Sequence, residues 1–162
     1  MKKRPDDEVL AILSASIGRR FLGVGSLGCL GLFLLYFAFA QPADTALAQG
    51  FLLIAGVGAV LLADKMRRAT SQSIELTSSE LRTSHGEQIA RLDEIDAVDR
   101  SIFAFKPSNG FLIRLKSSRE IRWRPGLWWR FGRRIGIGGV TPGSHAKAMS
   151  EIIAVMLLEQ NK

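Results

Sequence analysis

The sequence predicts a membrane protein of the α+β class, in which a two-helix transmembrane hairpin precedes a small antiparallel β barrel or sandwich capped by one C-terminal helix. Two uncharged apolar runs predict the hairpin, short segments of alternating polarity predict the β domain, and an apolar face at helical spacing predicts the last helix. The 162 residues include 22 Lys and Arg against 15 Asp and Glu. None of these 22 lies between Phe21 and Ala63, where Asp44 is the single charge, so a purely soluble protein is excluded.

The two predicted spans are residues 21–40 and 45–63, within a hairpin of 21–64. The first run has 20 residues, and a helix of that length covers about 30 Å, the thickness of a bilayer's hydrocarbon core. Between the runs, Pro42 and Asp44 favour a tight turn in water. A signal peptide cleaved after Ala40 is the competing interpretation, but the acidic residues 6–8 in the leading segment argue against it.

The flanking charges predict the orientation of the hairpin. Basic residues precede the first span at Lys2, Lys3, Arg4, Arg19 and Arg20, and follow the second at Lys65, Arg67 and Arg68. The connecting turn has none, so the positive-inside rule places both termini in the cytoplasm. The spans contain no Asp, Glu, Lys, Arg or His, which argues against a transporter or channel.

Small residues lie along both predicted spans, where they allow helices to approach closely in lipid. The candidates for helix packing are Gly23, Gly25, Gly28, Gly31, Ala55 and Ala59. The two spans either pack on each other through these residues or dock against another membrane protein.

The segments that flank the hairpin are expected to be cytoplasmic. Residues 1–20 contain acids at positions 6–8 and an apolar face of Val9, Leu10, Leu13 and Ile17, which favours a helix. This helix either lies in the membrane interface or extends the first span. Residues 65–72 are a basic and polar linker to the following domain.

Residues 73–162 are predicted to form the cytoplasmic domain. We expect strands at 74–77, 80–84, 88–92, 102–105, 111–116, 120–123 and 134–140, with 93–100 undecided between a helical turn and a loose strand. The sequence Asn109-Gly110 predicts a hairpin turn over 106–110, and residues 117–119 predict another. Thr141 and Pro142 suit the start of a helix over 142–160.

The segments SIELTSSELRT (73–83), FAFKPSNGFLIRLK (103–116) and WRPGLWWRFGRRIGIGGVTPG (123–143), with the closing helix, resemble the bacterial membrane-anchored pleckstrin-homology-like (PH-like) proteins in their order of elements. The resemblance implies the bacterial inner membrane and a binding module for lipids, peptides or proteins. Phosphoinositide-binding relatives carry a basic cluster in the first turn of the domain. Here that turn is Ser78-Ser79, so this ligand is not expected.

The stretch from Arg114 to Arg134 concentrates basic residues and all three tryptophans. The candidate contact residues are Arg122, Trp123, Arg124, Trp128, Trp129, Arg130, Phe131, Arg133 and Arg134. Trp and Arg suit an anionic membrane surface and also a protein interface. In the third interpretation one or two tryptophans fill the core and the arginines are solvated. Nucleic acid is not expected, because the chain is tethered at the bilayer.

No residue set suggests catalysis. Cys29 lies within a predicted span, the two histidines are far apart, and Gly136, Gly138 and Gly139 lack the spacing of a nucleotide-binding loop. We therefore expect no catalytic residue, metal or cofactor. The expected function is a non-catalytic accessory or assembly subunit that docks its domain on a larger membrane protein complex. The alternative is a sensor of anionic phospholipid head groups at the cytoplasmic leaflet.

Overall fold

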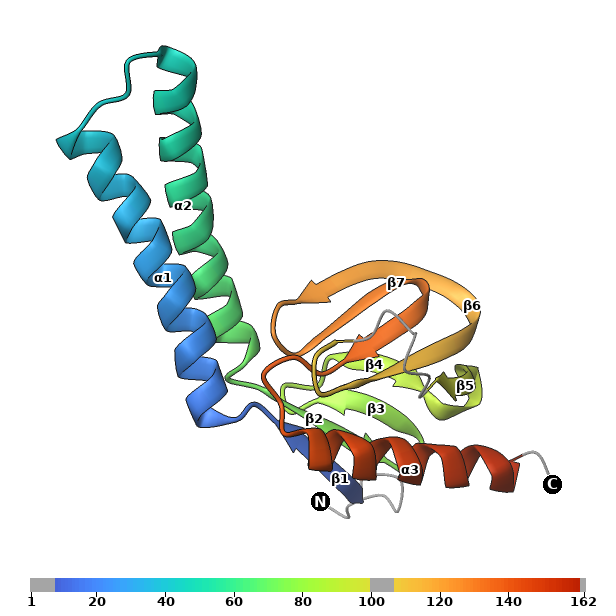
Figure 1. Ribbon diagram of the computed structural model, residues 1–162. Helices are drawn as coiled ribbons and strands as arrows, with labels where there is room; N and C mark the ends of the chain where they lie inside the picture. Colours follow the sequence, from blue (N-terminus) through green and yellow to red (C-terminus); the bar gives the residue numbers. More distant parts are fainter. Residues whose placement is uncertain (1–7, 100–106, 161–162) are drawn as a thin grey trace. The chain divides into compact units, whose positions relative to one another are not determined.

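Figure 1 shows a computed structural model of the chain, which describes residues 8–99 and 107–160. The chain divides into a helical unit, Ile17–Arg68, and a β unit that combines the residues up to Ser16 with those from Ala69 onward. The elements are β1 (Val9–Ser14), α1 (Ile17–Ala40), α2 (Ala46–Ala69), β2 (Ser73–Thr77), β3 (Glu80–Thr83), β4 (Gln88–Arg91), a 3-10 turn η2 (Leu92–Glu94), β5 (Ile95–Asp99), β6 (Phe111–Arg124), β7 (Trp128–Ile137) and α3 (Gly143–Gln160). Two long apolar helices, antiparallel sheets and a C-terminal helix confirm the α+β layout.

Both helices of the helical unit are long and apolar enough to cross a membrane, judged by length and composition. Each has 24 residues, more than the predicted spans, because residues 17–20 continue α1 before the first span and residues 64–69 continue α2 after the second, so most of the predicted linker 65–72 is helical. Gln49, the polar residue near the start of the second apolar run, closes the connecting turn. Its amide nitrogen donates to the Ala38 carbonyl at 2.6 Å, and its oxygen accepts from the Ala43 N–H at 2.9 Å.

Gly31 of α1 and Gly56 of α2 lie at a close contact between the two helices. A Cβ atom at Gly31 would stand 2.9 Å from the Gly56 carbonyl oxygen, and one at Gly56 would stand 2.8 Å from Cγ of Leu35. Both distances are below van der Waals contact, so this crossing requires glycine on both helices. Gly56 was not among the predicted packing residues.

The other predicted packing residues contribute unequally. A Cβ at Gly28 would reach ordinary contact, 4.0 Å from Ala63, whereas nothing lies within 4 Å of one at Gly25. Gly23, Ala55 and Ala59 are half-buried. The helices therefore pack on each other through part of the predicted surface, and Gly25 does not belong to that contact.

The first strand corrects the prediction for the N-terminal segment. Residues 9–14, expected within a helix that lies in the interface or extends the first span, form β1 and pair antiparallel with β2, with Leu13 opposite Ile74 and Ser14 opposite Ser73. Leu13 is fully buried in the core, whereas Ile12 is exposed, which is the alternation of a strand. The α1–α2 unit is thus inserted between the first two strands of a sheet.

The β unit contains two antiparallel sheets, ordered β1-β2-β3-β4 and β5-β6-β7. Their apolar faces enclose one core, which α3 completes by packing against β1, β5 and β6. Met149 and Ile153 are the α3 side chains most deeply buried there. In Figure 1 this helix (red) runs along the side of the sheets.

Most strand predictions in the first sheet are confirmed, and those in the second need correction. The predicted strands 74–77, 80–84 and 88–92 correspond to β2, β3 and β4, and the undecided segment 93–100 contains η2 and β5. The predicted strand 102–105 lies outside the described residues. The turn expected at 117–119 is wrong, because β6 continues through it with shifts of register against β7.

The start of β7 differs from the prediction, whereas the turn before β6 and the final helix are confirmed. β7 begins at Trp128, before the expected 134, and its register shift opposite Arg119 falls at Gly132, whose φ of 57° is in the left-handed region. The turn at 107–110 is confirmed by a hydrogen bond from the Gly110 N–H to the Pro107 carbonyl at 3.1 Å. The final helix is confirmed at 143–160.

Candidate interaction surfaces of the β6–β7 hairpin

The half of the β6–β7 hairpin that is nearer to its turn contains most of the Trp- and Arg-rich stretch. In its register Arg122 lies opposite Arg130, and Trp123 lies opposite Trp129. Residues opposite each other on antiparallel strands share a face, and their neighbours along the strand point the other way. The stretch therefore separates into two surfaces. We call the side with Ile121, Trp123, Trp129 and Phe131 the outer face, and the side with Arg122, Arg124, Trp128 and Arg130 the inner face.

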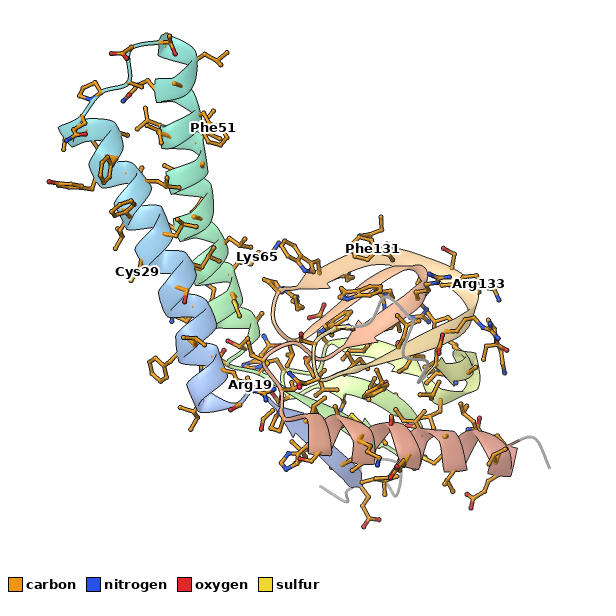
Figure 2. All side chains as sticks on the ribbon, viewed as in Figure 1. Arg19, Cys29, Phe51, Lys65, Phe131 and Arg133 are labelled. Atoms are coloured by element: carbon orange, nitrogen blue, oxygen red, sulfur yellow. The ribbon has the colours of Figure 1, made fainter. Side chains whose placement is uncertain are left out.

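The outer face is an exposed apolar surface. Ile121, Trp123 and Phe131 are 69%, 45% and 51% exposed, and Figure 2 shows Phe131 standing away from the ribbon. The Trp129 and Phe131 rings are in contact, with centroids 5.3 Å apart. Trp129 is half-buried because its indole covers Gly136, where any Cβ would overlap the ring. Because position 136 is glycine, the Trp129 ring has room to lie against the backbone there.

Two residues of the inner face, Trp128 and Arg130, are buried, so neither presents its side chain on the surface as predicted. Trp128 is 1% exposed and belongs to the core, as the core-tryptophan interpretation expects. Arg130 is 5% exposed, and its guanidinium carbon lies 5.9 Å from the centre of the Trp128 ring. Burial lowers the pKa of Arg130, and the nearby positive charges of Arg119 and Arg122 lower it further.

Backbone carbonyls, rather than carboxylates, hold the buried Arg130. Its Nε donates to the Glu120 carbonyl at 2.9 Å, and its Nη1 donates to the Ile89 carbonyl at 2.7 Å. Glu120 lies on β6 and Ile89 on β4, so the side chain connects the two sheets. These two hydrogen bonds from Arg130 hold the hairpin against the first sheet.

Ion pairs engage several arginines of β6. Arg124 donates to Glu87 through Nε at 3.0 Å and Nη2 at 2.7 Å, and Arg122 reaches the same carboxylate at 3.5 Å. Arg119 pairs with Glu94. These contacts turn the predicted cationic surface into a partly neutralised network.

Arg133 and Arg134, in the part of β7 that follows Gly132, are exposed. Arg133 donates from Nε to the Leu115 carbonyl at 3.0 Å and is labelled in Figure 2. Arg134 lies opposite Arg114 in the register, and Arg114 pairs with Asp96 at 2.6 Å. Among the nine predicted contact residues, Trp123, Phe131, Arg122, Arg133 and Arg134 are exposed.

Hydrogen bonds connect the hairpin turn to the residue at which the chain enters α1. The Val140 N–H donates to the Gly126 carbonyl at 3.1 Å, and the Ser16 N–H donates to the Val140 carbonyl at 2.8 Å. Gly126 is in the turn between β6 and β7, and Ser16 is the last residue of the β unit before α1. The turn is therefore fixed to the point where the β unit meets the helical unit in sequence.

The division into two faces was not predicted, although the sequence carries a signal for it. Ile121 and Trp123 alternate with Arg122 and Arg124, and a continuous strand would have assigned them to opposite sides. The predicted strand 120–123 contains part of this alternation, but residues 128–133 were outside every predicted strand, so the two halves of the hairpin were not matched.

No protein-family model matches the chain, and comparisons with curated proteins and with solved structures found no match.

Proposed function

We propose that this chain is a non-catalytic accessory or assembly subunit of a larger membrane protein complex, on which its PH-like domain docks through the outer face of the β6–β7 hairpin. In this proposal α1 and α2 anchor it in the inner membrane of a bacterium, with both termini in the cytoplasm. The anchor limits the search for a partner to two dimensions, and the β unit provides the recognition surface.

The observation that carries the proposal is the exposure of a fixed aromatic surface. Trp123 and Phe131 present large apolar areas to solvent, and such patches mark interaction sites on folded domains. Tryptophan is also enriched among the residues that dominate interface energetics. The Trp129 ring is packed against Gly136, so its position is fixed before binding. Less side-chain entropy is therefore lost when the outer face associates with a partner.

A membrane-bound partner is favoured by the connection of the hairpin to the anchor. The hydrogen bonds from Ser16 to Val140 and from Val140 to Gly126 connect the hairpin turn to Ser16, the residue that precedes α1 in the sequence. If α1 enters the bilayer at that point, the turn stays near the membrane surface. A partner that reaches the adjacent outer face is then itself held at the membrane.

The PH-like assignment has support in the strand arrangement. The four-stranded and three-stranded antiparallel sheets, followed by one helix, agree with the order of elements on which the resemblance rests. The helical unit between β1 and β2 makes this an interrupted version of that arrangement. We assign it a binding role, since such domains commonly serve as binding modules.

The alternative function, a sensor of anionic head groups on an arginine-rich surface, has less support. Arg119 and Arg124 pair with glutamates, and Arg130 is buried. Within the described residues, Arg133 and Arg134 are the exposed arginines of the predicted contact set that pair with no carboxylate, whereas exposed Arg122 reaches Glu87 and Glu120. Electrostatic attraction of about 1 kcal/mol per basic residue near an anionic surface gives two of them a small contribution.

A photo-crosslinking residue placed at Trp123 tests the proposal in native membranes. The expected result is a discrete crosslinked band that contains a second integral membrane protein. The same residue at Val155, an exposed position on α3, is the matched control and should not give this band. Crosslinks from position 123 to lipid alone would favour the head-group sensor and contradict the proposal.

A further inference from the structure

An open groove lies between the start of β4 and the inner side of the β6–β7 hairpin. Its volume is about 550 Å³, and its lining is polar. The residues that line it include Glu87, Gln88, Ser118, Arg119, Arg122 and Arg130. We call it the basic groove. It lies on the inner side of the hairpin, so it is distinct from the outer face proposed for docking.

The charges around the basic groove do not cancel. Four arginines, at positions 119, 122, 124 and 130, stand among three glutamates, at positions 87, 94 and 120. Arg119 and Arg124 have close carboxylate partners, and Arg122 has two distant ones at 3.4 and 3.5 Å. Within residues 8–99 and 107–160, Arg130 is the member of the four that contacts no carboxylate. One positive charge is left over.

Arg130 is both fixed and incompletely bonded. Carbonyls hold its Nε and Nη1, while its Nη2 has no acceptor within the described part of the chain. An arginine stays protonated in proteins, and a buried charge that bonds to no carboxylate is unfavourable, although Glu120 and Glu87 attract it from further away. Arg122 lies directly opposite on β6, and like charges across a strand pair repel each other. An anion in the groove would supply a counter-charge to Arg130 and reduce the repulsion between Arg122 and Arg130.

We propose that the basic groove binds a phosphate group, with Arg130 and Arg122 as its principal contacts. The guanidinium groups of Arg119, Arg122 and Arg130 and the Ser118 hydroxyl offer more donors than the two oxygens of a carboxylate accept. A phosphate has more acceptor oxygens, and arginine matches it with two parallel hydrogen bonds. The phosphate belongs either to a soluble phosphorylated compound or to a lipid head group.

The first test measures phosphate binding to the full-length protein in an uncharged detergent. Inorganic phosphate replaces chloride at constant ionic strength, and the melting temperature is followed with increasing phosphate. The expected result is a saturable rise, because a ligand that binds the folded state alone stabilises it. A rise that chloride reproduces at the same ionic strength would overturn the proposal.

Two variants locate the binding. Arg122→Gln removes an exposed contact of the groove and should weaken phosphate binding about tenfold or more. The matched control is Arg114→Gln, an exposed and ion-paired arginine on the same strand but outside the groove, which should leave the affinity unchanged. Equal affinities in both variants and the unmodified protein would contradict the proposal. Because Arg122 is exposed, the result does not depend on whether an Arg130 variant folds.

Nanodiscs distinguish the two sources of phosphate. If the source is a lipid head group, phosphatidic acid stabilises the protein relative to phosphatidylcholine, and Arg122→Gln removes the difference. If the source is soluble, inorganic phosphate binds equally in both kinds of nanodisc. Absence of phosphate binding in detergent and in both kinds of nanodisc would refute the proposal that the basic groove binds phosphate. It would leave the proposal of docking through the outer face unaffected.

Discussion

Ser14 and Ser73 are directly paired in the first sheet, although both helices of the helical unit lie between them in sequence. The chain therefore leaves the sheet and returns to it at the same place. Within the helical unit, Arg20 Nη2 donates to the Arg67 carbonyl at 3.2 Å, so the first turn of α1 lies beside the last turn of α2. A β unit that receives both ends of a helical hairpin requires them on one side of any membrane that the hairpin crosses.

This pairing predicts that the α1–α2 turn and the β unit are on opposite sides of the membrane. Single cysteines at Asp44→Cys, in the turn, and Ser78→Cys, between β2 and β3, test it in a Cys29→Ala background. Cys29 is the only native cysteine. An impermeant maleimide on spheroplasts should label position 44 and spare position 78.

Permeabilised cells provide the control for that labelling, since both positions are exposed and should then react equally. Equal labelling before permeabilisation, or labelling of position 78 alone, is incompatible with this topology. Neither cysteine alters a buried side chain, so the two variants report topology without disturbing the fold.

The helix crossing predicts unequal effects of two glycine substitutions. Gly31→Leu places a side chain against Val60 and the Gly56 backbone, and this overpacking should destabilise the protein by about 1–3 kcal/mol. A Cβ at Gly25 meets nothing within 4 Å, so Gly25→Leu should have little effect. Melting temperatures of the full-length protein in detergent check the difference. Equal shifts would show that the helices do not cross at Gly31.

The tryptophans of the hairpin are predicted to differ in stability and in binding. Trp128→Ala removes a buried core side chain and should lower the free energy of unfolding by about 3–5 kcal/mol. Trp123→Ala removes a half-exposed side chain and should lower it by less than Trp128→Ala does, because less apolar area is buried at position 123. Urea unfolding in detergent measures both. A larger loss at position 123 than at 128 would reverse the assignment of faces.

Periodicity in the sequence predicts those elements whose pattern is local. The apolar runs of α1 and α2 and the alternation in β2, β3 and β4 identify these elements, and α3 follows from its apolar face. β1 could not be predicted in this way, because its partner β2 lies beyond the helical unit. Its apolar residues also fit one face of a helix, and only the pairing with β2 decides between the two.

The candidate site was predicted in composition but not in arrangement. The Ser117-Ser118-Arg119 segment has the composition of a turn, yet it continues β6 at a register shift near Gly132. Because β7 begins at Trp128 and not at the predicted 134, its register with β6 places exposed Trp123 and buried Trp128 on opposite faces. The close carboxylate partners of Arg124 and Arg119 are Glu87 and Glu94, which lie outside the stretch, so no local pattern could have revealed these pairs.

The central claim is that the outer face binds a membrane protein partner, and co-purification with a paired variant tests it most directly. Trp123→Ser with Phe131→Ser removes the two exposed aromatic rings. Val155→Ser with Leu158→Ser removes similar exposed apolar area from α3 and is the control. After mild detergent extraction, the partner should co-purify with the unmodified protein and the α3 variant, and be lost from the hairpin variant. Retention of the partner by the hairpin variant, at the level of the α3 variant, would contradict the account.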